Sequence, residues 1–259
     1  MTLGSTQSEN LFDTWVFRKS KRSEISLRLL GIPYAGGGSA VFQGWHDAFD
    51  SRIEFGAVLL PGRERRWNEP ARKSVGSLVN SLATALEPSL SVPLALYGHS
   101  MGALIAFELA RELGRRGCPQ PVHIFLGARC SPEHKSQDSP IHRLPRDEFI
   151  EALTERYDSI PEEIRNEPEI LDVFLPSLRA DITLNETYVG YPDPPLFGAI
   201  TALIGSDDLW TSGTTCEKWA LQTAGSFRLS TLPGGHFFLR EHPSLLFEEI
   251  GRDLSRYLS

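Results

Sequence analysis

The segment LALYGHSMGALIAFELA, residues 94–110, decides the fold. It begins with an apolar run, Leu94–Tyr97, continues with the pentapeptide GHSMG at 98–102, and ends in apolar residues at helical spacing. A strand, a GxSxG pattern and a helix in this order form a nucleophile elbow, in which the flanking glycines allow a tight turn that lifts the serine hydroxyl above the sheet. GxSxG alone arises by chance, but in this context we predict that Ser100 is a nucleophile at a helix N-terminus.

The rest of the chain alternates short apolar runs with longer amphipathic segments, which is typical of a largely parallel sheet covered by helices. Together with the elbow, this predicts an α/β protein of the α/β-hydrolase fold, in one domain over 1–259, with a mostly parallel central sheet flanked by helices. The predicted strands are Leu27–Ile32, Phe55–Leu60, Leu94–Tyr97, Val122–Leu126, Ala199–Ile204 and Phe227–Leu232. The predicted helices are Val75–Leu86, Ala103–Leu113, Thr215–Gln222 and Pro243–Leu258.

Residues 131–195 interrupt this alternation, because they comprise roughly 65 residues without a convincing strand, far more than a usual connection. We predict an inserted helical lid subdomain over 131–195, with helices at Pro145–Tyr157 and Pro168–Tyr188, the second interrupted by Pro176. Such an insertion can cover a hydrolase site, and the alternative is a packing appendage. Four of its apolar residues either line a substrate chamber or simply pack its core: Phe149, Leu153, Phe174 and Leu178.

Composition and charge exclude several classes of protein. A chain of 259 residues with 41% apolar and 23% charged content can bury a full core. A formal net charge of −7 argues against nucleic acid as the main partner. The polar N-terminus lacks the apolar stretch of a signal peptide, and no segment reaches the roughly 18 apolar residues of a membrane span. We therefore expect a cytoplasmic protein that does not associate with membranes.

The three cysteines, Cys118, Cys130 and Cys216, are far apart in the sequence and form no CxxC pattern. We interpret them as reduced structural thiols and expect neither disulfides nor a zinc site. No function follows for any of them.

Two backbone donors are needed to stabilise the oxyanion that forms when a serine attacks a carbonyl carbon. The residue after the nucleophile, Met101, can supply one of them. The second is expected from the loop after an early strand, where the glycine-rich segment PYAGGG occupies 33–38. The alternatives for this segment are an ordinary glycine-rich turn or a phosphate loop. A phosphate loop is disfavoured because the segment lacks the GK[ST] ending.

The base must follow Ser100, because α/β-hydrolases use the order serine, acid, histidine. His46 and His99 precede it and fail this test. His236 lies in the segment PGGHFF at 233–238, just after the last predicted strand. His242 is a competitor, but it directly precedes a proline at a predicted helix start and is interpreted as a cap or surface residue. We predict that His236 is the base.

The acid should follow the strand Ala199–Ile204, and the sequence there reads GSDD at 205–208. Either Asp207 or Asp208 could accept a hydrogen bond from the histidine, while the other caps the turn or the next helix. The residues alone leave this choice open. Asp181 lies in the insertion and is interpreted as a structural acid.

Arg63, Arg65 and Arg66 follow the second predicted strand, in the segment PGRERR. Cations clustered in this way indicate a contact with an acidic partner or a phosphate. The alternative is a solvated loop.

The chain resembles the type II thioesterases that accompany polyketide and nonribosomal peptide synthetases. The resemblance extends from about Leu29 to the C-terminus, and it depends on the order and spacing of several blocks. These blocks are PYAGG at 33–37, Trp45, PGRE at 61–64, GHSMG at 98–102 with AFEL at 106–109, LRAD at 178–181, ETY at 186–188, Gly205 with Asp208, Trp219 and GGHF at 234–237. The chain departs from the family pattern at Cys130, Ser131 and Pro132 and has a longer N-terminal tail.

The resemblance implies a catalytic triad of Ser100, His236 and Asp208, because the acid of the family occupies the fourth position of a Gly-x-x-Asp turn. It also implies that the backbone N–H groups of Ala35 and Met101 form the oxyanion hole. No cofactor and no metal ion are implied.

In function, the resemblance implies hydrolysis of aberrant acyl groups from the phosphopantetheine arm of acyl or peptidyl carrier proteins, through an acyl-enzyme, so that a stalled synthase restarts. The partners are then carrier protein domains, and we expect a monomer. Three alternatives remain: a carboxylesterase of the same fold that acts on small esters, a chain-releasing cyclase, and a non-catalytic binding protein built on a hydrolase scaffold.

Overall fold

The computed structural model describes residues 11–20, 24–134, 138–157 and 167–258. Parts of the predicted N-terminal tail and of the predicted lid, at 1–10, 135–137 and 158–166, lie outside these residues. In the parts of the chain that are described, no helix combines the length and the apolarity needed to cross a bilayer.

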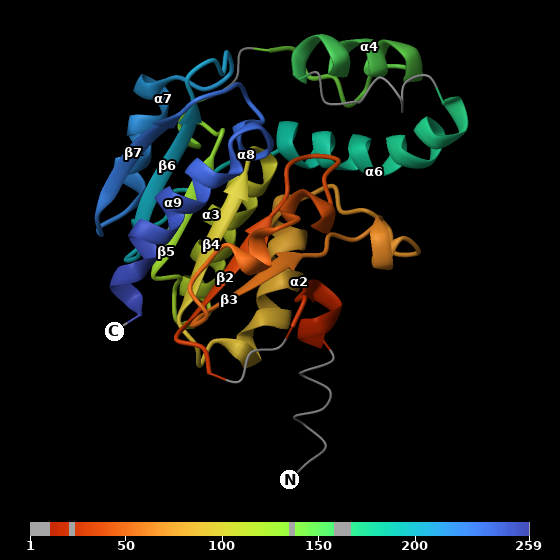
Figure 1. Ribbon diagram of the computed structural model, residues 1–259. Helices are drawn as coiled ribbons and strands as arrows, with labels where there is room; N and C mark the ends of the chain where they lie inside the picture. The colour runs from red at the N-terminus through yellow and green to blue at the C-terminus, as the bar shows by residue number, and fades with distance from the viewer. Residues whose placement is uncertain (1–10, 21–23, 135–137, 158–166, 259) are drawn as a thin grey trace.

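Seven strands form one sheet in the order β1-β3-β2-β4-β5-β6-β7 (Figure 1). β1 runs antiparallel to β3, and every other pair of neighbours is parallel. The predicted α/β fold with a mostly parallel sheet is therefore confirmed. The strands are β1 (Val16–Phe17), β2 (Leu27–Ile32), β3 (Ile53–Val58), β4 (Leu94–His99), β5 (His123–Gly127), β6 (Ala199–Gly205) and β7 (Phe227–Leu232).

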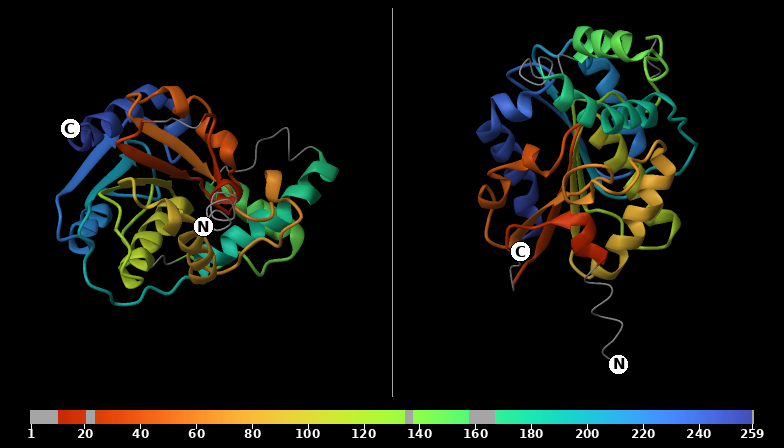
Figure 2. Two further views of the ribbon diagram at one scale, coloured as in Figure 1. Left: turned by 90° about the horizontal axis from the view of Figure 1, so that it is seen from below. Right: turned by 90° about the vertical axis from the view of Figure 1, so that its right-hand side faces the viewer.

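Helices cover both faces of this sheet (Figure 2). α2 (Val75–Leu86) and α3 (Met101–Arg115) pack on one face, and α9 (Pro243–Leu254) packs on the other. Successive side chains of β4 point to opposite faces, so Leu96 joins the first layer and Tyr97 the second. Because both faces are covered, every residue of β2 to β6 is buried, which explains why these strands appear in the sequence as nearly continuous apolar runs.

Short helices complete the described chain, and some element bounds differ from those predicted. The two-residue strand β1 is too short to show an alternating pattern and was not predicted, and β3 lies two residues earlier than expected. The predicted helix at 215–222 is an α-helix followed by a 3-10 helix. The further elements outside the inserted region are η1 (Ser39–Phe42), η2 (Trp45–Asp47), η3 (Glu64–Arg66), η4 (Glu87–Ser89), α7 (Gly213–Glu217), η5 (Lys218–Gln222), α8 (Phe238–Glu241) and η6 (Ser255–Tyr257).

Two helices of the inserted region, α4 (Arg146–Tyr157) and α6 (Pro168–Glu186), lie above the carboxyl ends of the strands (Figure 1). Their facing apolar side chains form a buried cluster that is separate from the two clusters of the sheet. Its members are Ile141, Phe149, Leu153, Leu171, Leu175, Leu178 and Ile182. The insertion thus has a small core of its own.

α6 continues through Pro176 as one helix, so the predicted interruption is wrong. Proline removes the N–H that would bind the carbonyl four residues earlier, which here belongs to Asp172. Both residues are exposed, so water can satisfy that carbonyl and the helix can continue.

Candidate active site

Ser100 occupies the tight turn between β4 and α3, with φ 53° and ψ −112°, a backbone conformation that residues with a side chain rarely adopt. Two glycines make the turn possible. A Cβ atom on Gly98 would lie 2.1 Å from the Gly102 carbonyl oxygen, and one on Gly102 would lie 2.1 Å from that of Ile32. The Ser100 N–H also donates to the Gly127 carbonyl at 2.8 Å. The surrounding strands and helix therefore hold the strained backbone of Ser100 in place.

The structure brings Ser100, His236 and Asp208 together at the carboxyl edge of the sheet. His236 Nε2 lies 3.0 Å from Ser100 Oγ, and His236 Nδ1 lies 3.0 Å from Asp208 Oδ2. An imidazole placed between a hydroxyl and a carboxylate in this way can take the hydroxyl proton while the oxygen attacks an electrophilic carbon. This is the geometry of nucleophile, base and orienting acid, and their catalytic roles stay a prediction.

The Asp208 side chain is fully enclosed, with 0% exposure. The Trp210 N–H donates to Oδ1 at 2.9 Å, and the Thr211 hydroxyl donates to Oδ2 at 2.6 Å. Burial disfavours the charged form, but the hydrogen bond and charge of His236 and the bonds from Thr211 and Trp210 outweigh it, so the pKa of Asp208 is lowered from its ordinary value. Asp208 is therefore a carboxylate that can accept the His236 Nδ1–H at neutral pH.

Of the two aspartates that the sequence leaves open, Asp208 is the one that contacts His236. The Asp207 side chain is exposed, and its backbone N–H donates to the Gly234 carbonyl at 2.9 Å. His242 lies at the N-cap of α9, away from this arrangement.

His99, the second residue of the GHSMG segment, is hydrogen-bonded to the backbone of His236. The sequence analysis did not predict this contact. His99 Nε2 lies 2.7 Å from the His236 carbonyl oxygen, and because a carbonyl only accepts, Nε2 must carry a proton. The Tyr97 hydroxyl, 3.0 Å from Nδ1, then donates to that nitrogen. Burial, together with the nearby His236, lowers the pKa of His99 to about 3. His99 is thus a neutral, fixed donor that orients the loop of His236.

A cavity of about 30 Å³, large enough to hold water, opens at Ser100 beneath α6. Ala35 and Met101, the predicted oxyanion donors, lie on its wall. The first N–H groups of a helix have no intrahelical carbonyl, so the Met101 N–H is available, and no described residue accepts the Ala35 N–H. The oxyanion role stays a prediction. The lining residues are Tyr34, Ala35, Ser100, Met101, Leu178, Ile182, Asn185, His236 and Phe237.

Of the four apolar lid residues singled out from the sequence, only Leu178 lines this cavity. Phe149 and Leu153 belong to the separate core of the insertion, so the packing alternative holds for them. Ile182 and Asn185 line the cavity but were not predicted. Both follow Leu178 at helical spacing, and this periodicity was the signal available in the sequence.

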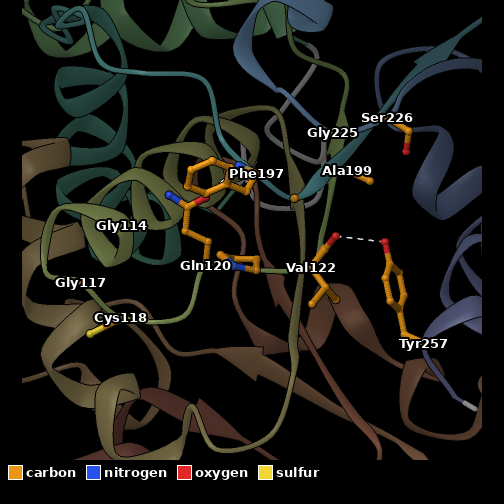
Figure 3. A pocket seen from close by; sticks show the side chains of 12 residues that line it. Gly114, Gly117, Cys118, Gln120, Val122, Phe197, Ala199, Gly225, Ser226 and Tyr257 are labelled. Atoms are coloured by element: carbon orange, nitrogen blue, oxygen red, sulfur yellow. Dashed lines mark hydrogen bonds between the residues drawn. The ribbon is translucent and has the colours of Figure 1, made fainter.

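A larger hollow of about 670 Å³ lies at the amino ends of β5, β6 and β7 (Figure 3). It is open and contains none of the predicted site residues. Cys118, Gln120 and Phe197 line it, and the Tyr257 hydroxyl donates across it to the Val122 carbonyl at 3.0 Å. We assign no chemistry to this hollow. Among the described residues, no group of three or more His, Cys, Asp or Glu side chains is placed to hold a metal ion.

Asp181 and Arg63 form a buried ion pair that ties α6 to the glycine-rich loop. The Arg63 guanidinium contacts both carboxylate oxygens of Asp181 at 2.7 Å, and its Nη1 also donates to the Gly37 carbonyl at 2.9 Å. The Gly36 N–H donates to Asp181 Oδ2 at 2.8 Å. Asp181 is therefore structural, as interpreted, and it fixes the loop that carries Ala35.

The predicted cationic surface at Arg63, Arg65 and Arg66 is wrong for two of the three residues. Arg63 is buried in the pair with Asp181, and Arg66 is buried where it binds the Leu59 carbonyl and the Glu69 carboxylate. Arg65 alone is exposed. The sequence cluster reflects internal ion pairing, because each buried guanidinium has an acidic partner.

Comparisons with known proteins give independent evidence on the family and the fold. The model of the thioesterase domain family matches residues 28–254. The chain is 35% identical over 245 residues to gramicidin S biosynthesis protein GrsT of Aneurinibacillus migulanus, with 95% of each chain covered.

Two solved structures are also similar. The RedJ thioesterase of the prodiginine pathway of Streptomyces coelicolor is 34% identical with a TM-score of 0.83, covering 90% of this chain and 92% of that one. YbtT, a type II thioesterase of the yersiniabactin pathway, is 29% identical with a TM-score of 0.84, covering 95% and 100%. These matches confirm the resemblance that the sequence blocks indicate.

The first prediction concerns the triad. Ser100→Ala and His236→Ala should each lower kcat by roughly 10⁶-fold and should not be additive, because the two residues act as a unit. Asp208→Asn should cost roughly 10⁴-fold, because it no longer fixes the His236 tautomer. Asp207→Asn, the matched control, should change kcat little. Steady-state kinetics measure these effects, and a larger loss for Asp207→Asn than for Asp208→Asn would contradict the assignment of the acid.

The second prediction concerns the buried ion pair. Asp181→Ala leaves the Arg63 charge buried without its partner and should lower the free energy of unfolding by about 3–5 kcal/mol. Asp172→Ala, on the same helix, removes an exposed partner of Arg146 and should cost no more than about 1 kcal/mol. Denaturant unfolding of both variants is the measurement. Equal losses of unfolding free energy in the two variants would show that the buried ion pair of Asp181 with Arg63 contributes no more to stability than an exposed one.

Proposed function

Because the chain belongs to the thioesterase domain family, we propose that it hydrolyses acyl thioesters on the phosphopantetheine arm of acyl or peptidyl carrier proteins. Hydrolysis of thioesters follows from the family itself. The proposal adds the carrier-bound substrate and a role in editing misprimed or stalled polyketide and nonribosomal peptide synthetases. GrsT, RedJ and YbtT are named for the biosynthesis of gramicidin S, prodiginine and yersiniabactin, and this supports the same setting here.

The observation that carries the proposal is the line from Ser100 Oγ through the His236 ring to the Asp208 carboxylate, with 3.0 Å at each step. Ser100 attacks the thioester carbonyl carbon while His236 Nε2 takes its proton. The resulting oxyanion accepts hydrogen bonds from the backbone N–H groups of Met101 and Ala35. When the tetrahedral adduct collapses, His236 returns the proton to the departing thiolate, which leaves as the carrier thiol, and an acyl-enzyme remains.

Water then completes the reaction. His236 removes a proton from a water molecule, which attacks the acyl-enzyme carbonyl, and the same proton returns to Ser100 as the acid leaves. Asp208 does not need to accept a proton in either half. It holds the His236 ring in one tautomer and stabilises the imidazolium, and its lowered pKa keeps it charged for this role.

The cavity at Ser100 is too small to hold an acyl group as it stands. Pockets that hold small molecules usually measure roughly 300–1,000 Å³, far more than the cavity at Ser100. Leu178 and Ile182 of α6 form part of the wall of that cavity. We therefore infer that α6 moves when an acyl group enters, and that its cavity-facing side chains limit the acyl length.

The third prediction tests the substrate class. Incubating the protein with an acetyl-loaded carrier protein should release holo-carrier, which intact-mass spectrometry measures. Ser100→Ala should release none above the uncatalysed rate, because the nucleophile is gone. Turnover of a small oxygen ester should be slower than that of the carrier-bound thioester. Fast ester cleavage with no activity on loaded carrier would instead favour the carboxylesterase alternative.

The fourth prediction concerns acyl length. Leu178→Phe adds volume at the wall of the cavity and should lower turnover of the longest acyl chains by roughly tenfold, consistent with about 1–3 kcal/mol for overpacking, with little change for acetyl. Leu171→Phe is the matched control, because Leu171 lies on the same helix and in the same core but does not line the cavity. A series of acyl thioesters of increasing length gives the profile. If both variants give the wild-type profile, α6 does not limit chain length.

A further inference from the structure

Two of the three cysteines, Cys130 and Cys216, are distant in the sequence but lie close together in space, next to the loop that carries Asp208. Cys130 follows β5, and Cys216 lies in α7. Cys130 Sγ lies 3.0 Å from the Thr215 hydroxyl, and Cys216 Sγ lies 3.4 Å from the Arg129 carbonyl oxygen. Each sulfur thus contacts the residue that precedes the other cysteine. Both cysteines are free, as expected, but the two thiols are neighbours in space, which their distance in the sequence did not indicate.

The two thiols differ in exposure and in acidity. Cys130 is partly exposed, whereas Cys216 is completely buried. The hydrogen bond with the Cys216 thiol, against the opposing effect of burial and with help from Thr215 and His134, lowers the pKa of Cys130 to about 6. The same hydrogen bond and burial raise the pKa of Cys216. A pair of this kind combines an accessible thiolate with a neighbouring thiol that can resolve its oxidised form.

The pair is also linked to the acid of the site. Cys130 Sγ lies 3.6 Å from the carbonyl oxygen of Trp210, whose N–H donates to Asp208. Thr211 holds the other carboxylate oxygen, and Ser212 caps α7, the helix that carries Cys216. Any movement of Cys130 toward Cys216 therefore acts on the short segment that positions Asp208.

We propose that Cys130 and Cys216 form a redox-sensitive dithiol site, which a peroxide converts to a disulfide that slows turnover. The Cys130 thiolate attacks one oxygen of hydrogen peroxide, the O–O bond breaks, and the protonated leaving group departs as water. The resulting sulfenic acid is attacked by the Cys216 sulfur, and its hydroxyl leaves with the Cys216 proton as a second water. In total, two thiols lose two electrons and two protons, and one peroxide becomes two waters.

Closing this bond changes the support of Asp208. A disulfide holds its sulfur atoms about 2.05 Å apart, so closing it moves the Cys130 sulfur, which now contacts the Trp210 carbonyl and the Thr215 hydroxyl. A displacement of a catalytic group by about 1 Å can lower its rate by roughly 10²-fold. The inference uses the triad of the proposed function for this effect on turnover, whereas the formation of the disulfide does not depend on it.

The first experiment measures the disulfide itself. After mild treatment with hydrogen peroxide, intact mass should show the loss of two hydrogen atoms, and peptide mapping should join the peptides of Cys130 and Cys216. Cys118→Ser is the matched control and should give the same disulfide, because Cys118 lies at the amino ends of the strands (Figure 3). Cys130→Ser should abolish it. No disulfide, or one that includes Cys118, would overturn the proposal.

The second experiment measures turnover of a small acyl-cysteamine thioester before and after oxidation. The rate should fall roughly 10- to 100-fold and return with dithiothreitol. Cys130→Ser and Cys216→Ala should keep most of their rate under the same treatment. If either variant that still folds is inactivated as strongly as the wild type, or if the disulfide forms with no change in rate, the regulatory part is wrong. An inactive reduced wild type would overturn the proposed function and not the dithiol site, which mass spectrometry reads separately.

Discussion

The structure depends on the contact between Gly98 and Gly102, where the end of β4 meets the first turn of α3 with no room for a side chain. This contact forces Ser100 into a strained backbone conformation and directs it to the carboxyl edge of the sheet. The acid and the histidine then need only follow parallel strands, because such strands end at the same edge. One tight packing constraint in the centre of the sheet therefore fixes where the whole site can form.

Around this centre, buried polar contacts join segments that are distant in the sequence. His99, itself part of the elbow, holds the His236 carbonyl, while Arg63 and Asp181 join the glycine-rich loop to the inserted helix. Each of these groups is buried and would be costly if left alone. The site is thus held by interactions that stabilise the fold only when all partners are in place, which gives the loops around Ser100 one defined arrangement.

The sequence predicted those parts of the molecule that are encoded locally. The strand, the elbow and the helix at 94–110 lie in one continuous segment, and the acid and the histidine were located from the residue order of the fold together with the strand ends. Asp208 could not be distinguished from Asp207 by pattern, because only the direction of the turn after β6 separates them. Arg63 was misinterpreted as a surface cation because its partner, Asp181, lies 118 residues further along the chain. The contact of Cys130 with Cys216 was missed for the same reason.

The separate core of the insertion allows its helices to open locally while the sheet stays folded. The apolar contacts of α4 and of most of α6 are made within their own cluster, whereas Leu184, near the end of α6, packs into the main core beside α3. The end of α6 that carries Leu184 is also held by the ion pair of Asp181 with Arg63, so the rest of the helix pair can open about this end as a cooperative unit while the sheet keeps its hydrophobic contacts. Local opening of this foldon then costs far less free energy than global unfolding.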